Sequence, residues 1–134
     1  MAKDWQKVEE AVRQYLQELF GQEFVKRTVQ LKKKLDLGNG NTLEQFEFDA
    51  VSDDGKVIAE IKAFAHPEHP REMKLAEEDV LRLALANGER KLLFLIDPLF
   101  YQVFCQKNRN NLLQWRKMGI EIVSPFELTN YLEA

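Results

Sequence analysis

Two strand-like segments, residues 43–52 and 56–64, are joined through Asp54-Gly55, and this junction constrains the fold more than any other part of the sequence. An Asp-Gly pair between two alternating apolar segments favours a two-residue hairpin turn, because the turn needs backbone angles that glycine adopts at low cost. Such a turn makes the residues on either side of it opposite neighbours. The sequence therefore predicts an antiparallel hairpin with a defined register.

Counting outward from this turn predicts which residues of the two strands face each other. The expected pairs are Val51 with Ile58, Ala50 with Ala59, Asp49 with Glu60, Phe48 with Ile61 and Glu47 with Lys62. Alternation along each strand then divides the side chains between two faces of the sheet. One face is expected to be core and contains Phe46, Phe48, Ala50, Ala59, Ile61 and Ala63. The other mixes charged and apolar groups: Glu47, Asp49, Val51, Ile58, Glu60, Lys62 and Phe64.

The mixed face places Asp49 opposite Glu60, although two carboxylates that face each other across strands repel. Apolar neighbours suggest that this face is partly covered, and burial adds to the repulsion. A divalent cation between the carboxylates would turn this conflict into a binding site, because Mg²⁺ takes one or two carboxylates plus waters. Lys62 lies on the same face and could balance charge, contact a phosphate or help to activate a water. The alternative is an ordinary solvated face with a Glu47–Lys62 ion pair.

Hydrophobic spacing and turn residues divide the rest of the chain into helices and strands. The sequence predicts helices over residues 4–20 and 71–87, strands over 24–37, 92–97 and 120–123, a broken helix over 98–117, and a last helix after Ser124. The strand at 24–37 is expected to be irregular at Arg27 and Lys33, which interrupt its apolar side. The segment HPEHP is predicted to be a surface loop rather than a histidine metal site, because its prolines oppose helical ligand spacing.

This order of elements predicts the fold class. The first three strands follow one another through short turns and favour an antiparallel meander, whereas helical crossovers before the last two strands favour parallel pairing. We therefore predict an α/β fold with a mixed sheet. No linker or repeat divides the chain, so residues 1–134 are expected to form a single domain.

Composition excludes several classes of protein. No run of about 18 apolar residues exists, so no membrane span is expected, and the first residues lack the apolar centre of a signal peptide. Cys105 is the only cysteine, which rules out an internal disulfide or a cysteine zinc cluster and suggests a cytoplasmic protein. A net charge of −3 argues against strong non-specific binding to nucleic acid, although Lys26, Arg27 and residues 32–34 concentrate basic charge on one strand.

The spacing of Asp49 and Glu60-Ile61-Lys62 on consecutive strands resembles the signature of the PD-(D/E)XK phosphodiesterase superfamily, which includes many restriction endonucleases and archaeal Holliday junction resolvases. The core of that family, αβββαβ, matches the order predicted for residues 4–97, and the later segments would be a C-terminal βα extension. Phe48 replaces the proline of the motif, which is often missing in family members.

The resemblance implies metal-dependent hydrolysis of nucleic acid, with DNA favoured over RNA and Mg²⁺ (Mn²⁺ in vitro) as the cofactor. Asp49, Glu60 and the Ile61 carbonyl would hold the metal, and Lys62 would help to position the attacking water. Many family members add a glutamate from the first helix. Glu9 is our first candidate, because it borders the apolar stripe of residues 4–20, and the neighbouring Glu10 is the second.

A second hypothesis is a catalytically inactive module with the same fold that binds nucleic acid or a partner protein. The acidic pI of 5.5 favours this hypothesis. In either case, a domain with few basic residues is expected to need a second copy, as a homodimer, or a partner subunit to hold its substrate. We expect exposed aromatic residues between Pro98 and Trp115, such as Phe100, to form that contact.

Overall fold

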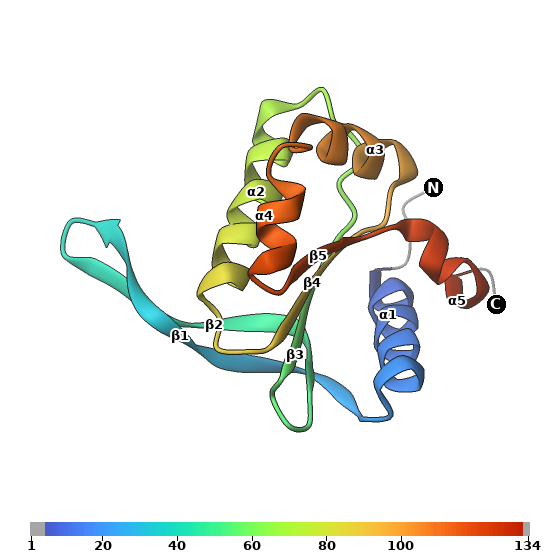
Figure 1. The fold of residues 1–134 in the computed structure, drawn as a ribbon, viewed down its shortest axis with the longest axis horizontal. Helices are drawn as coiled ribbons and strands as arrows, with labels where there is room; N and C mark the ends of the chain where they lie inside the picture. Colours follow the sequence, from blue (N-terminus) through green and yellow to red (C-terminus); the bar gives the residue numbers. More distant parts are fainter. Residues whose placement is uncertain (1–4, 133–134) are drawn as a thin grey trace.

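The computed structural model describes residues 5–132 and has the order of helices and strands that the sequence predicts (Figure 1). The elements are α1 (Trp5–Phe20), β1 (Phe24–Gly38), β2 (Asn41–Ser52), β3 (Val57–Lys62), α2 (Pro70–Leu85), β4 (Arg90–Leu95), α3 (Pro98–Lys107), α4 (Leu112–Lys117), β5 (Ile120–Val123), the 3₁₀ helix η1 (Pro125–Leu128) and α5 (Thr129–Leu132). None of these helices is long and apolar enough to cross a membrane.

The five strands form one mixed sheet in the order β1-β2-β3-β4-β5. Strands β1, β2 and β3 pair antiparallel, whereas β4 joins β3, and β5 joins β4, in parallel orientation. This arrangement confirms the predicted α/β fold class, with an antiparallel meander followed by helical crossovers.

Helices cover both faces of the sheet, so the core has two separate parts (Figure 1). Against one face, α1 packs the apolar side chains Val8, Val12 and Leu16. Against the other, α2 packs Met73, Ala76, Val80 and Leu83 beside aromatic residues of α3. Each large apolar side chain that is fully buried in this way contributes about 1.5–3 kcal/mol to folding.

The turn between β2 and β3 fixes the register of the hairpin. Gly55 has a φ of +74°, a conformation that glycine adopts readily. The carboxylate of Asp54 accepts hydrogen bonds from the Ser52 hydroxyl at 2.7 Å and from the Lys56 amide at 2.9 Å, and Gln22 donates to it at 3.0 Å. These bonds hold the strands in the predicted pairing next to the turn, Val51 with Ile58 and Ala50 with Ala59.

The stretch of β2 that leads into this turn has one more residue than the stretch of β1 that pairs with it. The pairs that show it are Val25 with Val51 and Arg27 with Phe48. Asp49 and Ala50 therefore share a single opposite position, that of Lys26, which defines a β-bulge.

The bulge corrects one prediction about the faces of the hairpin. Phe48 and Phe46 pack with Val51 in the core under α2, whereas Ala50 and Ile61 pack in the core under α1. The single apolar face predicted for these residues, and the pairing of Phe48 with Ile61, are therefore wrong, because the extra residue at the bulge reverses the alternation of β2.

The outer part of the β1–β2 hairpin projects from the body as an arm (Figure 1). The expected irregularities at Arg27 and Lys33 coincide with register shifts between Val25 and Arg27 and between Gln30 and Leu35. An isolated bridge from Leu31 to Ala86 ties the base of the arm to the end of α2.

Candidate metal and acid cluster

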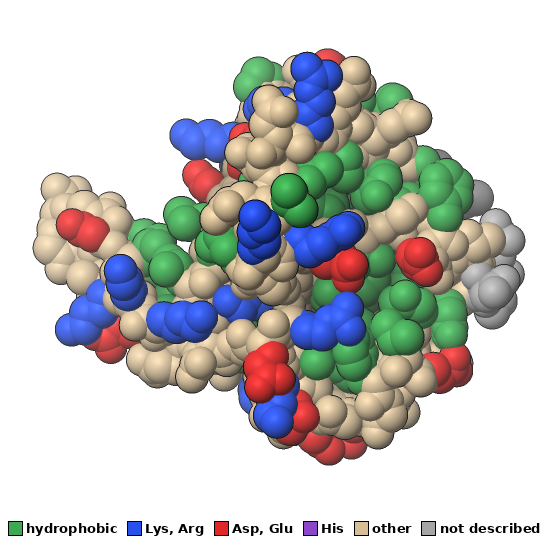
Figure 2. Space-filling model, viewed as in Figure 1, with side chains coloured by type: hydrophobic (Ala, Val, Ile, Leu, Met, Phe, Trp, Pro, Cys, Tyr) green, Lys and Arg blue, Asp and Glu red, His purple; other side chains and the backbone are tan. Residues whose placement is uncertain are grey.

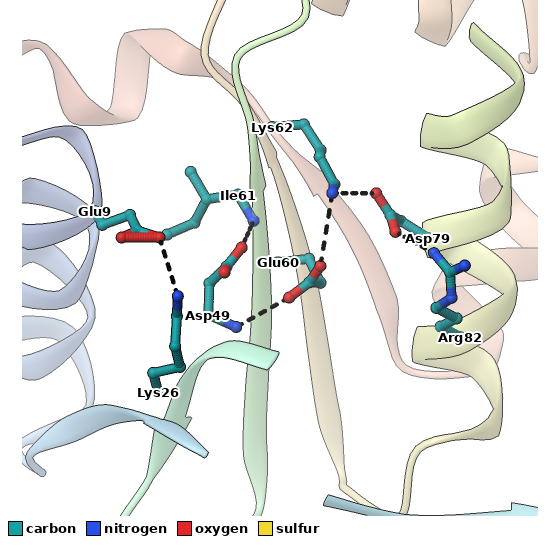
Figure 3. A network of polar contacts seen from close by, with 8 residues as sticks. All are labelled: Glu9, Lys26, Asp49, Glu60, Ile61, Lys62, Asp79 and Arg82. Carbon is teal, nitrogen blue, oxygen red and sulfur yellow. Dashed lines mark hydrogen bonds and ion pairs between the residues drawn. The ribbon is translucent and has the colours of Figure 1, made fainter. Parts of the chain in front are cut away.

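Regular backbone pairing between β2 and β3 ends at Ala50 and Ala59, and the next residues along the two strands are the predicted metal-binding acids, Asp49 and Glu60. The Asp49 amide donates to Glu60 Oε1 at 2.9 Å, and the Ile61 amide donates to Asp49 Oδ2 at 2.9 Å (Figure 3). Each carboxylate thus accepts a hydrogen bond from the backbone of the opposite strand. The expected proximity of Asp49 and Glu60 is confirmed, although through side-chain bonds rather than a continued ladder.

Glu60 is an acid placed almost wholly inside the protein, with 3% of its surface exposed. Burial raises the pKa of this carboxyl to about 8, and the neighbouring negative charge of Asp49 adds to the effect. The hydrogen bond from the Asp49 amide and the charge of Lys62 oppose it. Such a strongly shifted acid is characteristic of functional sites, although structural networks also produce it.

Lys62 follows Glu60 on the same face of β3. Its ammonium nitrogen lies 4.0 Å from Glu60 Oε2 and 3.2 Å from Asp79 Oδ2, so one cation serves two carboxylates (Figure 3). The alternative ion pair with Glu47, which a solvated face would allow, does not form, because Glu47 is exposed and Lys62 turns toward α2.

Asp79 and Arg82 on α2 belong to this cluster and were not predicted from the sequence. The Asp79 side chain is 1% exposed, and its Oδ1 accepts from Arg82 Nη1 at 3.0 Å. Burial raises the pKa of Asp79, and the charges of Lys62 and Arg82 oppose that rise. A signal was available, because Asp79 lies three residues after Ala76 and one before Val80 on the buried side of the helix. An acid on an apolar stripe needs a partner.

Glu9 faces the sheet from α1, as predicted, whereas Glu10 is exposed. Glu9 Oε1 lies 3.8 Å from the Lys26 ammonium, opposite the bulge (Figure 3). Arg13, one turn further along α1, donates to the Asp49 carbonyl at 3.3 Å. These side chains line an open pocket of about 480 Å³ between α1 and β1.

The cluster offers a small set of oxygen donors. Asp49 Oδ2 and Glu60 Oε1 are used in backbone bonds, and Asp49 Oδ1 has no partner within residues 5–132. Within that range no group of three or more acid, histidine or cysteine side chains could hold a metal. Two carboxylates with the Ile61 carbonyl nevertheless match Mg²⁺, which keeps several waters and uses one or two protein carboxylates.

Two further predictions lie outside this cluster. Residues 66–69 of the HPEHP segment form a loop, as expected, in which His66 pairs with Glu68 at 3.4 Å, and Pro70 begins α2. The expectation that Phe100 is an exposed contact residue is wrong, because its ring is 0% exposed and packs in the core beside Phe64 and Phe104. The two buried aromatic residues of α3, Phe100 and Phe104, belong to the same core as the apolar side chains of α2.

Comparisons with models of known protein families, with curated proteins and with solved structures gave no match.

Proposed function

We propose that this chain is a metal-dependent phosphodiesterase that hydrolyses nucleic acid, with DNA as the expected substrate. The observation that carries the proposal is the meeting of Asp49, Glu60 and Lys62 where the β2–β3 ladder stops. Two carboxylates beside one ammonium are the combination of side chains that the PD-(D/E)XK resemblance implies.

Each residue of the cluster has a distinct expected role. Asp49, Glu60 and the Ile61 carbonyl would hold Mg²⁺, which when bound polarises a phosphate and makes a coordinated water more acidic. Lys62, which is only partly buried, would hold the attacking water or a phosphate oxygen by its ammonium group. Glu9 on α1, which pairs with Lys26, would be a further acid beside the site and not one of the metal ligands.

A nucleic-acid substrate is supported by the distribution of basic side chains. Lys and Arg follow the β1–β2 arm on the face shown in Figure 2. Residues 32–34 on the arm are exposed lysines, and Lys26 and Arg13 line the pocket next to the bulge. A backbone phosphate that reached Asp49 from this pocket would pass Lys26 and Arg13, and such contacts contribute to affinity in a salt-dependent way.

The test is cleavage of DNA and RNA by the purified protein with Mg²⁺ or Mn²⁺. Asp49→Asn is expected to abolish cleavage, while Glu47→Gln, an exposed acid two residues earlier on the same strand, is expected to cleave as the wild type does. Cleavage that persists in Asp49→Asn would remove the assignment of this site.

A second candidate function is a non-catalytic binding module. The observation that favours it is the closed charge network, in which Lys62 is already engaged by two carboxylates. Calorimetric titration with Mn²⁺ separates the two functions. Binding that is lost in Glu60→Gln supports the enzyme, whereas absence of binding in the wild type supports the module.

We also propose that the chain acts as a homodimer or with a partner subunit. The exposed apolar residues of the second half now provide the candidate contacts in place of Phe100: Leu99, Leu113, Met118 and Phe126. The mass of the wild type in solution, measured by light scattering over a range of concentrations, tests this proposal.

A further inference from the structure

Asp79 is the buried acid that approaches Lys62 most closely. Its Oδ2 lies 3.2 Å from the Lys62 ammonium, against 4.0 Å for Glu60 Oε2. Oδ2 is fully enclosed, and its ion pair with the Lys62 ammonium is its one close polar contact within the described part of the chain. Burying a carboxylate in this way is costly, and the cost is offset only when the partner is held in place.

Arg82 fixes the other side of the Asp79 carboxylate. Its guanidinium donates to Oδ1 at 3.0 Å from one turn along α2, and the same group stacks over the Phe46 ring at 4.8 Å. Arg82 therefore holds the Asp79 carboxylate from the same helix, while its own guanidinium packs on Phe46 of β2. The free oxygen of the carboxylate points at Lys62 on β3 (Figure 3).

Glu60 cannot fix Lys62 in the same way. One of its oxygens accepts the Asp49 amide, and the other is at the limit of an ion-pair distance from the ammonium. A Glu60 carboxylate that binds a cation has less negative charge left to attract Lys62. Asp79 is then the anion that determines where the ammonium lies.

We propose that Asp79 is a positioning residue for Lys62: it holds the lysine ammonium on the α2 side of β3, beside Glu60. This inference rests on the proposed phosphodiesterase function for its consequence in catalysis, but not for the contact itself. It predicts that loss of the Asp79 charge lowers turnover while substrate and metal binding are retained, because Asp79 touches neither.

The contact is tested first by NMR on protein with ¹⁵N-labelled lysine. Ammonium protons exchange quickly with water unless an ion pair holds them, so a Lys62 signal, assigned by its loss in Lys62→Arg, is expected in the wild type. The signal should disappear in Asp79→Asn and remain in Glu78→Gln, the adjacent acid of α2 with no ion pair in the described chain. An unchanged Lys62 signal in Asp79→Asn overturns the proposal whether or not the protein cleaves DNA.

A measurement on the wild type covers the case in which Asp79→Asn does not fold. A nuclear Overhauser effect between Lys62 Hε and Asp79 Hβ is expected from the ion pair, and its absence overturns the proposal.

Kinetics then test the consequence. Asp79→Asn is expected to lower kcat about 10- to 100-fold, the usual effect of removing a group that orients a functional side chain, with KM for DNA and the Mn²⁺ affinity close to wild type. A loss confined to KM, or full activity, overturns the positioning role. Wild-type protein without cleavage would instead refute the phosphodiesterase, and the NMR result would still decide whether Asp79 holds Lys62.

Discussion

The amide of Asp49 donates to the carboxylate of Glu60 at the position where a backbone carbonyl would accept in a regular antiparallel ladder. The Ile61 amide in turn donates to the carboxylate of Asp49. At this point of the hairpin, side-chain oxygens therefore accept the hydrogen bonds that backbone carbonyls accept in a regular ladder. Both carboxylates are thereby held by the main chain of the opposite strand. Their geometry depends on the backbone of the hairpin more than on neighbouring side chains.

Glu9 and Glu10 provide a matched test of the third acid. Glu9 is buried and faces Lys26, whereas Glu10 is exposed. If the protein is a phosphodiesterase, Glu9→Gln is expected to lower cleavage about tenfold or more, and Glu10→Gln to leave it unchanged. Initial rates at saturating Mn²⁺ measure the difference. Equal rates for the two variants would exclude Glu9 from the site.

Phe100 and its neighbour Leu99 separate core from surface on α3. Phe100→Glu puts a charge into a fully buried position and is expected to lower the free energy of unfolding by more than about 3 kcal/mol. Leu99 is 56% exposed, so Leu99→Glu should change stability by less than about 0.5 kcal/mol at a protein concentration at which light scattering shows a monomer. Urea unfolding gives both values. A stably folded Phe100→Glu protein would contradict this placement.

Lys91 predicts a pH dependence of stability. The residue is 2% exposed on β4, its ammonium donates to the Ala84 carbonyl at 3.3 Å, and burial together with the charge of Lys32 lowers its pKa to about 8. Between this value and the ordinary 10.5, the unfolded chain holds a proton that the folded protein lacks. The free energy of unfolding should therefore rise with pH across that range.

Lys91→Met removes this dependence. The variant is expected to be more stable than the wild type at pH 7 by about 1 kcal/mol or more, with a smaller gain at pH 10. Lys74→Met, at an exposed position on α2, serves as the control and should show no such change with pH. Urea unfolding at the two pH values measures the effect, and a gain independent of pH would contradict it.

Gly119, just before β5, lies so close to the backbone of Glu89 that a side chain would not fit there. Gly119 and Gly40 have similar positive φ angles, 83° and 78°, but only at Gly119 would a Cβ meet a backbone atom, the Glu89 carbonyl oxygen at 2.7 Å. Gly40→Ala is expected to cost about 1–2 kcal/mol through the backbone conformation, and Gly119→Ala at least about 1 kcal/mol more through the clash. Thermal or urea unfolding compares them, and equal losses would refute the contribution of packing.

Much of the fold followed from local signals in the sequence. The Asp54-Gly55 turn set the register next to it, and apolar spacing predicted the helices and the two parallel strands. The bulge did not follow, because Asp49 and Ala50 fit a regular strand as well as an irregular one. Only the packing of Phe48 beneath α2 distinguishes them.

Only the part of the acid cluster that lies within the hairpin could be predicted from local signals in the sequence. Asp49, Glu60 and Lys62 are close in a hairpin and can be paired by counting. Asp79 reaches them from a helix whose position on the sheet is a tertiary property, and Glu78 beside it has the same charge without the burial. Phe100 was misplaced because an aromatic residue after a proline shows no preference for core or surface until the helix is packed.

The bulge in β2 also makes the length of that strand as important as its residues. Removing one residue between Phe48 and Val51 would restore a regular alternation in which both residues still face α2, but only one residue would then lie opposite Lys26. The strand would then lose either the carboxylate of Asp49 or the small buried side chain of Ala50, which packs in the core under α1. We therefore expect chains that share this site to keep two residues in this segment, the first of them an acid.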